Sequence, residues 1–398
     1  MSRAAAISDR IREQASGPRD GSVVWLARSA DPDRTPSAPL GPYLYGGTTG
    51  VALFLAALDH VRDRTDNRET VLRALAPVRR KLTELVGDPE RARGVRMPVG
   101  GLVGLGALVY ALVHIGRWID EPVLIREAHD STLLLTPERI LADDQFDVVR
   151  GCAGAVLALL VLDQVTSDPN ARGATPLDLA NACADHLLDS RVSRDGGPRT
   201  WRAAGLPPLT GFAHGAAGIG YALLRLFLRT GAERLRDAAL EAFAFEQTLF
   251  DPVEDNWWDP RFGRPLQLAA WCYGAPGMAL SRLGTPETAR GEEAARMLKM
   301  TQSLPDAPVD TLCCGNLGRV EILLHAHRVL GGDDLLEAAR ALAERTLERA
   351  DTRGDFAVSP PGEEPESELA LFCGSSGIGY TLLRLARPAA LPSPLCME

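Results

Sequence analysis

Two adjacent cysteines, Cys313 and Cys314, stand directly before a glycine in the segment TLCCGNLG. A third cysteine, Cys272, takes the same kind of position earlier in the chain, in WCYGAPG. Thiolate sulfur is a preferred ligand of Zn²⁺, and three protein ligands leave the fourth tetrahedral position open, as in catalytic zinc sites. The three cysteines therefore predict a zinc site that keeps one position for a substrate.

Two other interpretations of these cysteines stay open at the level of sequence. The first is three buried thiols without a metal, because scattered cysteines specify a metal only weakly. The second is a closed site in which Cys373, from FCGSSG, is the fourth ligand. The N-terminal segment is polar and lacks an apolar signal sequence, so we expect a cytoplasmic protein. In that compartment clustered cysteines indicate metal binding or thiol chemistry rather than disulfides.

The cysteines belong to a pattern that recurs along the chain, G-x-x-G followed by small and apolar residues. Seven copies occur, and their first glycines are Gly47, Gly101, Gly151, Gly215, Gly274, Gly315 and Gly374. Amphipathic stretches of helical period lie between the copies, and no segment has the alternation of a convincing strand. A helix that is apolar all round is buried, so each repeat predicts one inner helix and one outer helix.

The repeats predict an all-α fold, an α/α toroid of seven inner and seven outer helices. We expect residues 1–40 to lead into the toroid and residues 41–398 to form it. Glycines would let the inner helices approach one another at the centre. Each glycine turn would also open a helix N-terminus toward one shared mouth, where the cysteines lie.

The same frame brings other polar residues to the mouth. His214 stands directly before the first glycine of the fourth repeat, which favours a general acid or base over a purely structural histidine. Asp147 lies four residues before the first glycine of the third repeat, and its position alone predicts a solvated loop residue. Trp257 and Trp258 are expected in a long loop, where they either line a peptide groove or pin the loop to the toroid.

Charge and hydropathy exclude two kinds of partner. The formal net charge of −9 argues against a nucleic acid, whose phosphates need a basic face. Residues 97–116 carry no charge over 20 residues, about the length of a membrane span, but they include Pro98 and five glycines. A buried helix is therefore expected there, and no membrane span.

The ordered motifs resemble those of the LanC-like lanthionine cyclases, most closely the C-terminal cyclase domain of class II (LanM-type) lanthipeptide synthetases. The pieces that carry the resemblance are FDVVRG, GFAHGAAGIGY, WCYGAPG, CCGNLG and FCGSSGIGYTLLRLARPAALPS, and it covers most of the chain. It implies an α/α toroid with zinc ligands at Cys272, Cys313 and Cys314. It also implies an active-site histidine at His214 and an active-site aspartate at Asp147.

The reaction that the resemblance implies is an intramolecular Michael-type addition. The thiol of a peptide cysteine adds to a dehydroalanine or dehydrobutyrine of the same peptide, which gives lanthionine or methyllanthionine. The expected partner is a dehydrated precursor peptide, leader plus core. The bifunctional relatives carry an N-terminal dehydratase domain, whereas this sequence begins with the cyclase. We therefore expect dehydration by a separate protein or by a domain that is missing here.

The sequence departs from most of the family at two positions. Most members have Cys-His-Gly where this chain has Cys313-Cys314-Gly315, which resembles a subgroup linked to substrate-tolerant synthetases. The family often has a basic residue four positions before the cysteine of W-C-x-G, and this chain has Leu268 there. The sequence thus offers no basic side chain for a substrate anion at that position.

Three other functions are compatible with parts of the pattern. A LanC-like zinc protein that only binds glutathione or a peptide thiol would share every ligand, as would an enzyme that adds glutathione to dehydro residues of proteins. A terpene or glycan enzyme with the same toroid would need paired acidic residues at the mouth. Only Asp147 stands in the motif frame, so the glutathione proteins remain as the alternative.

Overall fold

The computed structural model describes residues 1–18, 20–27, 38–193, 195–266, 269–363 and 367–398, so Leu268 lies outside the described residues. Within these ranges the chain forms seventeen α-helices, one short 3-10 helix and one three-stranded sheet. The prediction of an all-α fold is confirmed, with the small sheet as a local addition.

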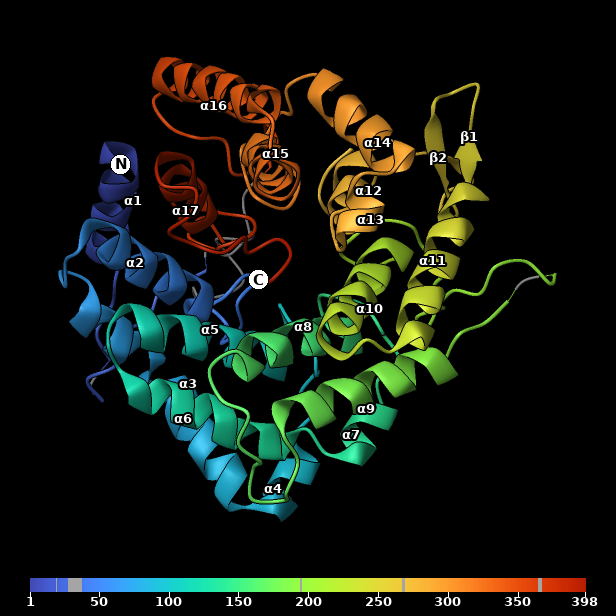
Figure 1. The fold of residues 1–398 in the computed structure, drawn as a ribbon. Coiled ribbons are helices and arrows are strands. Elements are labelled where there is room, and N and C mark those ends of the chain that lie inside the picture. The colour runs from blue at the N-terminus through green and yellow to red at the C-terminus, as the bar shows by residue number, and fades with distance from the viewer. Residues whose placement is uncertain (19, 28–37, 194, 267–268, 364–366) are drawn as a thin grey trace.

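Seven helices form a closed inner ring (Figure 1). In order around the ring they are α2 (Thr48–Arg62), α5 (Leu105–Trp118), α8 (Cys152–Asp163), α10 (Ala216–Thr230), α12 (Ala275–Arg282), α15 (Asn316–Leu330) and α17 (Ser375–Ala386). Each packs against the next, and α17 packs against α2. These helices are buried on nearly all sides, as their apolar composition predicts.

Each inner helix is covered by one outer helix. The outer helices are α3 (Arg68–Gly87), α6 (Pro122–Ser131), α9 (Pro176–Asp189), α11 (Glu233–Gln247), α14 (Glu292–Ser303), α16 (Asp333–Arg353) and α1 (Ser2–Glu13). The last of these packs against α17, so a helix from the N-terminal segment covers the final inner helix. The predicted toroid of seven inner and seven outer helices is confirmed.

Short elements fill the connections. They are α4 (Pro89–Gly94), the 3-10 helix η1 (Thr132–Leu134), α7 (Pro137–Leu141), α13 (Pro286–Ala289), β1 (Phe250–Asp251), β2 (Asn256–Asp259) and β3 (Arg264–Pro265). The three strands pair antiparallel in the order β1-β2-β3. Trp257 and Trp258, expected in a loop, lie on β2. Trp257 is buried against Phe250, whereas Trp258 is 39% exposed.

The uncharged stretch 97–116 contributes α5 to the inner ring. Among the helices of the described ranges, none combines the length and the apolar character that crossing a membrane requires. The C-terminal residues occupy the centre of the ring (Figure 1). There the indole Nε1 of Trp271 donates to the carbonyl oxygen of Leu395 at 3.0 Å, and Met397 is buried.

The first glycine of the motif begins the inner helix in six of the seven repeats, where it is the N-cap residue. The second repeat differs, because α5 begins one turn later with Gly104 as its N-cap. The residues before α5 instead form backbone hydrogen bonds with the third repeat. The N–H of Gly100 donates to the carbonyl of Arg150 at 2.9 Å, and the N–H of Gly101 donates to the carbonyl of Val148 at 3.1 Å. This pairing delays the start of the helix.

The second glycine of each motif lies against its own turn. A Cβ added there would lie between 1.8 and 2.4 Å from the carbonyl oxygen six residues earlier, at Gly50, Gly104, Gly154, Gly218, Gly277, Gly318 and Gly377. No side chain fits at such distances, so glycine lets the turn fold back over the first turn of its own helix. Contact with the preceding repeat, as between Gly154 and Gly101, is an addition to this local role.

Candidate metal centre and acid–base pair

The turns that precede the inner helices contact one another at one end of the ring. Cys313 N–H donates to the carbonyl of Phe372 at 2.9 Å, and Phe372 N–H to that of Tyr45 at 3.0 Å. Tyr45 N–H donates to Leu102 at 3.0 Å, and Leu102 N–H to Val149 at 3.1 Å. Backbone hydrogen bonds thus connect the turns of repeats six, seven, one, two and three at a shared mouth.

Between repeats three and six, contacts at the candidate functional residues connect the turns. His214 of repeat four bonds to Asp147 of repeat three. Gly211 of repeat four, at φ +93°, packs so closely that a Cβ there would lie 2.5 Å from the carbonyl oxygen of Cys272 in repeat five. Cys272 in turn contacts Cys314 of repeat six. The five residues singled out in the sequence therefore lie around one part of the mouth.

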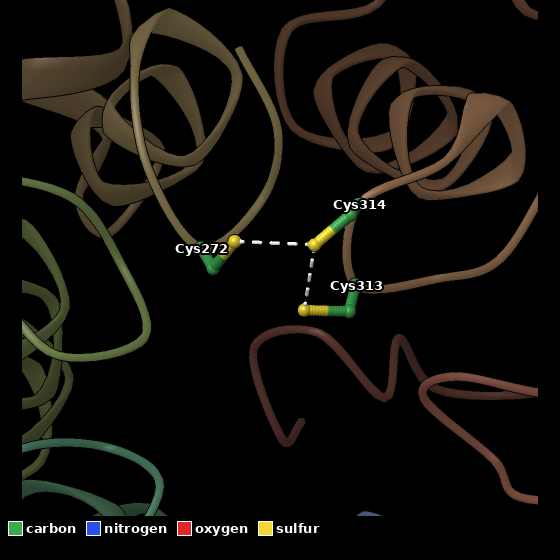
Figure 2. Close-up of side chains that lie close together, drawn as sticks. All are labelled: Cys272, Cys313 and Cys314. Carbon is green, nitrogen blue, oxygen red and sulfur yellow. Dashed lines mark hydrogen bonds between the residues drawn. The ribbon is translucent and has the colours of Figure 1, made fainter. Parts of the chain in front are cut away.

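The three cysteines form a compact group (Figure 2). Their sulfur atoms all lie within 4.8 Å of one another. The Sγ of Cys314 is 3.5 Å from that of Cys272 and 3.3 Å from that of Cys313. A tetrahedral zinc with Zn–S bonds of about 2.3 Å holds its sulfurs about 3.8 Å apart. The spacing and the donor type therefore fit a zinc ion.

Hydrogen bonds among the three thiols shift their pKa values in different directions. Hydrogen bonding with Cys272 and Cys313 lowers the pKa of the Cys314 thiol to about 4, although burial opposes the shift. Hydrogen bonds to Cys272 and Cys314 raise the pKa of Cys313 well above its ordinary value. The hydrogen bond with Cys313 lowers the pKa of Cys272, but the bond with Cys314 and burial outweigh it, and the pKa rises. The shared hydrogen bonds thus couple the ionisation of the three thiols.

Cys373, the alternative fourth ligand, has a different partner. Its thiol donates to the phenol oxygen of Tyr45 at 3.2 Å. It is not one of the three cysteines whose sulfurs cluster within 4.8 Å in the described structure. Tyr45 stacks on Phe372, the neighbour of Cys373, with ring centroids 5.0 Å apart. Cys373 also forms a hydrogen bond with Cys313 that raises the pKa of Cys313, so it lies beside the group of three sulfurs without being part of it.

Two further groups have the spacing of metal ligands. They are Asp143 with Cys152 and His186, and His325 with Cys396 and Glu398. In the first group, the carboxylate of Asp143 already accepts three backbone N–H bonds, one of them from Cys152 at 2.7 Å. In the second, Glu398 is paired with Arg328, whose positive charge disfavours a cation. The three thiols are the better candidate.

His214 and Asp147 form a close pair at the mouth. Nδ1 of His214 lies 2.6 Å from Oδ2 of Asp147. The other carboxylate oxygen accepts the N–H groups of Arg150 at 2.7 Å and Gly151 at 3.1 Å. Asp147 is only 3% exposed, so the prediction of a solvated loop residue from position alone was wrong. The turn folds back and buries its carboxylate, which fixes the imidazole and leaves Nε2 for proton exchange.

The small sheet brings a cation to the mouth that sequence reasoning missed. The guanidinium carbon of Arg261 lies 4.1 Å from the ring centre of Tyr273, the residue after Cys272. The Tyr273 ring lies 6.3 Å from the ring of His214. Arg261 is held by an ion pair with Asp259 of β2 at 2.6 Å. Arg261 stands outside the glycine frame, so only the pairing of the strands reveals its place.

A buried ion pair lies next to the turns of the mouth. The sequence analysis did not predict this pair. Nη1 of Arg282 on α12 donates a hydrogen bond to Oε2 of Glu246 on α11 at 2.6 Å, and both side chains are fully buried. Oε1 of Glu246 accepts the N–H of Gly211 at 3.1 Å. Burial raises the pKa of Glu246, and Arg282 opposes that shift. The pair ties the turn of His214 to the helix that follows Cys272. A lone arginine in an apolar inner helix was the signal available in sequence.

Comparison with known proteins gives a family match and a structural match. The family model described as "Lanthionine synthetase C-like protein" matches residues 38–397. The solved structure of nisin cyclase is similar with a TM-score of 0.62 at 16% identity, over 89% of this chain and 92% of that one. At this identity the likeness shows a shared fold, the α/α toroid.

Two other solved structures are similar at lower TM-scores. A sugar epimerase from a ruminal bacterium has a TM-score of 0.45 at 11% identity, over 78% of this chain and 99% of that one. A glycoside hydrolase family 76 mannosidase from Bacteroides thetaiotaomicron has a TM-score of 0.41 at 12% identity, over 98% of both chains. No curated protein matches the chain.

Proposed function

The chain belongs to the lanthionine synthetase C-like family, and we propose that it is a zinc-dependent lanthipeptide cyclase. It would add the cysteine thiols of a dehydrated precursor peptide to dehydroalanine or dehydrobutyrine in the same peptide. One observation carries the proposal: three thiols from two repeats meet beside a buried aspartate–histidine pair at one mouth. The name of the similar structure, nisin cyclase, supports a ring-forming activity on a peptide.

The thiols of Cys272, Cys313 and Cys314 would hold the metal. A peptide thiol has an ordinary pKa near 8.5 and is mostly protonated at neutral pH. When bound, Zn²⁺ would supply the positive charge that keeps a substrate thiol ionised at neutral pH. The thiol of Cys373 donates to Tyr45 and its sulfur is outside the three-cysteine group, which supports a fourth position for the substrate.

The addition needs proton transfer as well as an ionised sulfur. The S–H bond and the carbon–carbon π bond break, while a bond from sulfur to the β-carbon and a bond from hydrogen to the α-carbon form. His214 is the general acid that delivers a proton to the α-carbon. Asp147 holds Nδ1 at 2.6 Å and stabilises the charged imidazolium, so proton transfer takes place at Nε2.

Negative charge develops on the carbonyl oxygen of the dehydro residue as sulfur adds. Arg261, stacked on Tyr273 near His214, places a fixed positive charge on that side of the mouth. The N-terminal ends of α12 and α15 begin beside the cysteines and carry partial positive charge. These groups favour the enolate-like transition state over the neutral substrate.

The proposal extends to the dehydration of the precursor and to the compartment of the protein. We propose that a separate protein or domain dehydrates the precursor, because the addition needs a peptide that already carries dehydro residues. None of the seven cysteines forms a disulfide, which suits the reducing cytoplasm. The alternative function, addition of glutathione to dehydro residues, would use the same cysteines.

Substitution of His214 by alanine tests the role of the acid–base pair, and competition with glutathione tests the proposal against this alternative. The variant should retain zinc and lose ring formation on a synthetic peptide that contains a cysteine and a dehydroalanine. The wild-type protein should consume the peptide thiol without a change in peptide mass, even with glutathione in excess. A peptide that gains the mass of glutathione, with its own thiol still free, would favour the alternative.

A further inference from the structure

A cavity of about 1350 Å³ opens beside the mouth, between α4, α7 and the segment 95–99. Arg150 lines it, and the N–H of this residue donates to Oδ1 of Asp147 at 2.7 Å. The cavity therefore adjoins the turn that carries the acid–base pair. Its volume exceeds the roughly 300–1,000 Å³ of most small-molecule pockets, so it suits a longer occupant.

The wall of this groove is formed in advance by Arg139 of α7. Its Nη2 donates to the carbonyl of Ala92 at 2.9 Å, and its Nη1 to those of Met97 at 3.0 Å and Val95 at 3.3 Å. Its Nε is buried without a hydrogen-bond partner in the described structure. One guanidinium thus cross-links α4 and the following segment to α7. A wall fixed in this way loses little entropy when a ligand binds.

The groove is basic although the whole chain is acidic. The lining arginines are Arg93, Arg96, Arg139, Arg150 and Arg172, and the lining carboxylates are Glu138, Asp143 and Asp144. Arg96, Arg150 and Arg172 are exposed and form no ion pair with any residue that the structure describes. Asp143 is engaged by three backbone N–H groups. Five arginines against three carboxylates give the lining a surplus of two positive charges in a chain of net charge −9.

Apolar side chains lie among the arginines. They come from α3, the segment after α4, and η1, and they are Leu85, Val86, Val95, Met97, Leu133 and Leu134. A surface of exposed arginines around an apolar floor matches a segment that has carboxylates on one side and apolar side chains on the other. Nothing in this pattern requires bases or phosphates.

We propose that this groove binds an acidic, amphipathic segment of the substrate peptide, outside the part that forms rings. The inference rests on the proposed function, because it takes the occupant to be the peptide that is cyclised. A peptide held beside the mouth presents its thiols at a high effective concentration. Successive cysteines of one chain then reach one centre without release of the peptide.

Binding is tested with a fluorescent probe that has no cysteine and no dehydro residue, so ring formation plays no part. The probe is an amphipathic peptide of glutamate and leucine, and its matched control has glutamine in place of glutamate. Fluorescence anisotropy is measured with the zinc-loaded protein. Wild type should bind the glutamate probe at least about tenfold more tightly than the glutamine probe, with the difference shrinking at high salt.

The double variant Arg96→Glu/Arg172→Glu should lose this preference, with affinity for the glutamate probe about tenfold weaker. The control is Arg340→Glu on α16, another exposed arginine without an ion pair among the described residues, which should bind as wild type does. Equal binding of the two probes by wild type would overturn the proposal. So would a loss of affinity in the Arg340 variant equal to that in the double variant.

Ring formation separates this inference from the proposed function. On a dehydrated peptide that carries the acidic segment, the double variant should need about tenfold more peptide for half-maximal rate, with the maximal rate retained. On a peptide without the segment, it should match wild type. Rings formed with equal dependence on peptide concentration by both proteins contradict the groove. Absence of rings with wild type on both peptides contradicts the cyclase function, while the anisotropy result still decides the groove.

Discussion

Replacement of Asp147 by asparagine removes one negative charge and almost no volume. The remaining amide oxygen can still accept the N–H groups of Arg150 and Gly151, which now bond to Oδ1 at 2.7 and 3.1 Å. The group facing Nδ1 of His214, at 2.6 Å, becomes a neutral amide. The turn should keep its shape, while the imidazolium form of His214 loses its stabilising carboxylate.

The size of the effect follows from the burial of this contact. Asp147 is 3% exposed, so water screens the interaction weakly. A hydrogen bond to a charged group contributes about 1.5–3 kcal/mol, and each 1.4 kcal/mol or so of lost transition-state stabilisation slows a reaction about tenfold. We expect Asp147→Asn to form rings roughly ten- to a hundredfold more slowly than wild type.

The assay follows ring closure in a synthetic dehydrated peptide, with free thiols alkylated at each time point and counted by mass spectrometry. Zinc content is measured on the same samples. The control is Asp59→Asn, which changes a buried aspartate on α2 that accepts the N–H of Asn67 at 2.7 Å, away from the mouth. A folded, zinc-loaded Asp147→Asn protein within about twofold of the wild-type rate would refute the role of the charge.

Three further substitutions have expected outcomes. Cys314→His makes a zinc-loaded centre less negative by one charge, so rings should form more slowly and more selectively on a panel of peptides; unchanged rate and selectivity would contradict the electrostatic reasoning. Arg261→Met should slow ring formation about three- to tenfold with zinc content retained, because it removes the cation stacked on Tyr273. Gly218→Ala should lower the free energy of urea unfolding by about 1–3 kcal/mol, since its Cβ would lie 1.9 Å from the carbonyl oxygen of Phe212. Gly87→Ala, where a Cβ meets nothing within 4 Å, is its control and should be near neutral.

The toroid was predictable because its signal is repeated and local. Each glycine motif marks the start of an inner helix, and the period of the repeats indicates the number of helix pairs. The contact of α1 with α17 was not predictable, since it joins the two ends of the chain. The role of the second glycine was also missed in sequence, because the carbonyl that it accommodates, such as that of Phe212 for Gly218, takes its position only when the turn folds back.

Some residues of the candidate site could also be predicted from the sequence, and others could not. Cys272, Cys313, Cys314 and His214 share positions in the repeat frame, so the sequence predicts that they meet. Asp147 follows from the family resemblance alone, because its burial depends on the fold of its own turn. Contacts made by elements outside the frame leave no periodic signal. This is why the position of Arg261 emerged only from the structure, whereas the lone arginine of the inner helix α12 indicated a buried partner without identifying Glu246.

We propose above all that this chain forms thioether rings at a zinc ion held by three cysteines. The most direct measurement combines zinc analysis with a count of free thiols in a dehydrated peptide before and after incubation. We expect the loss of one alkylatable thiol for each ring at unchanged peptide mass, at a rate proportional to the zinc bound and abolished in Cys272→Ala. Equal ring formation by zinc-free protein, or thiol loss with a gain in mass, would contradict it.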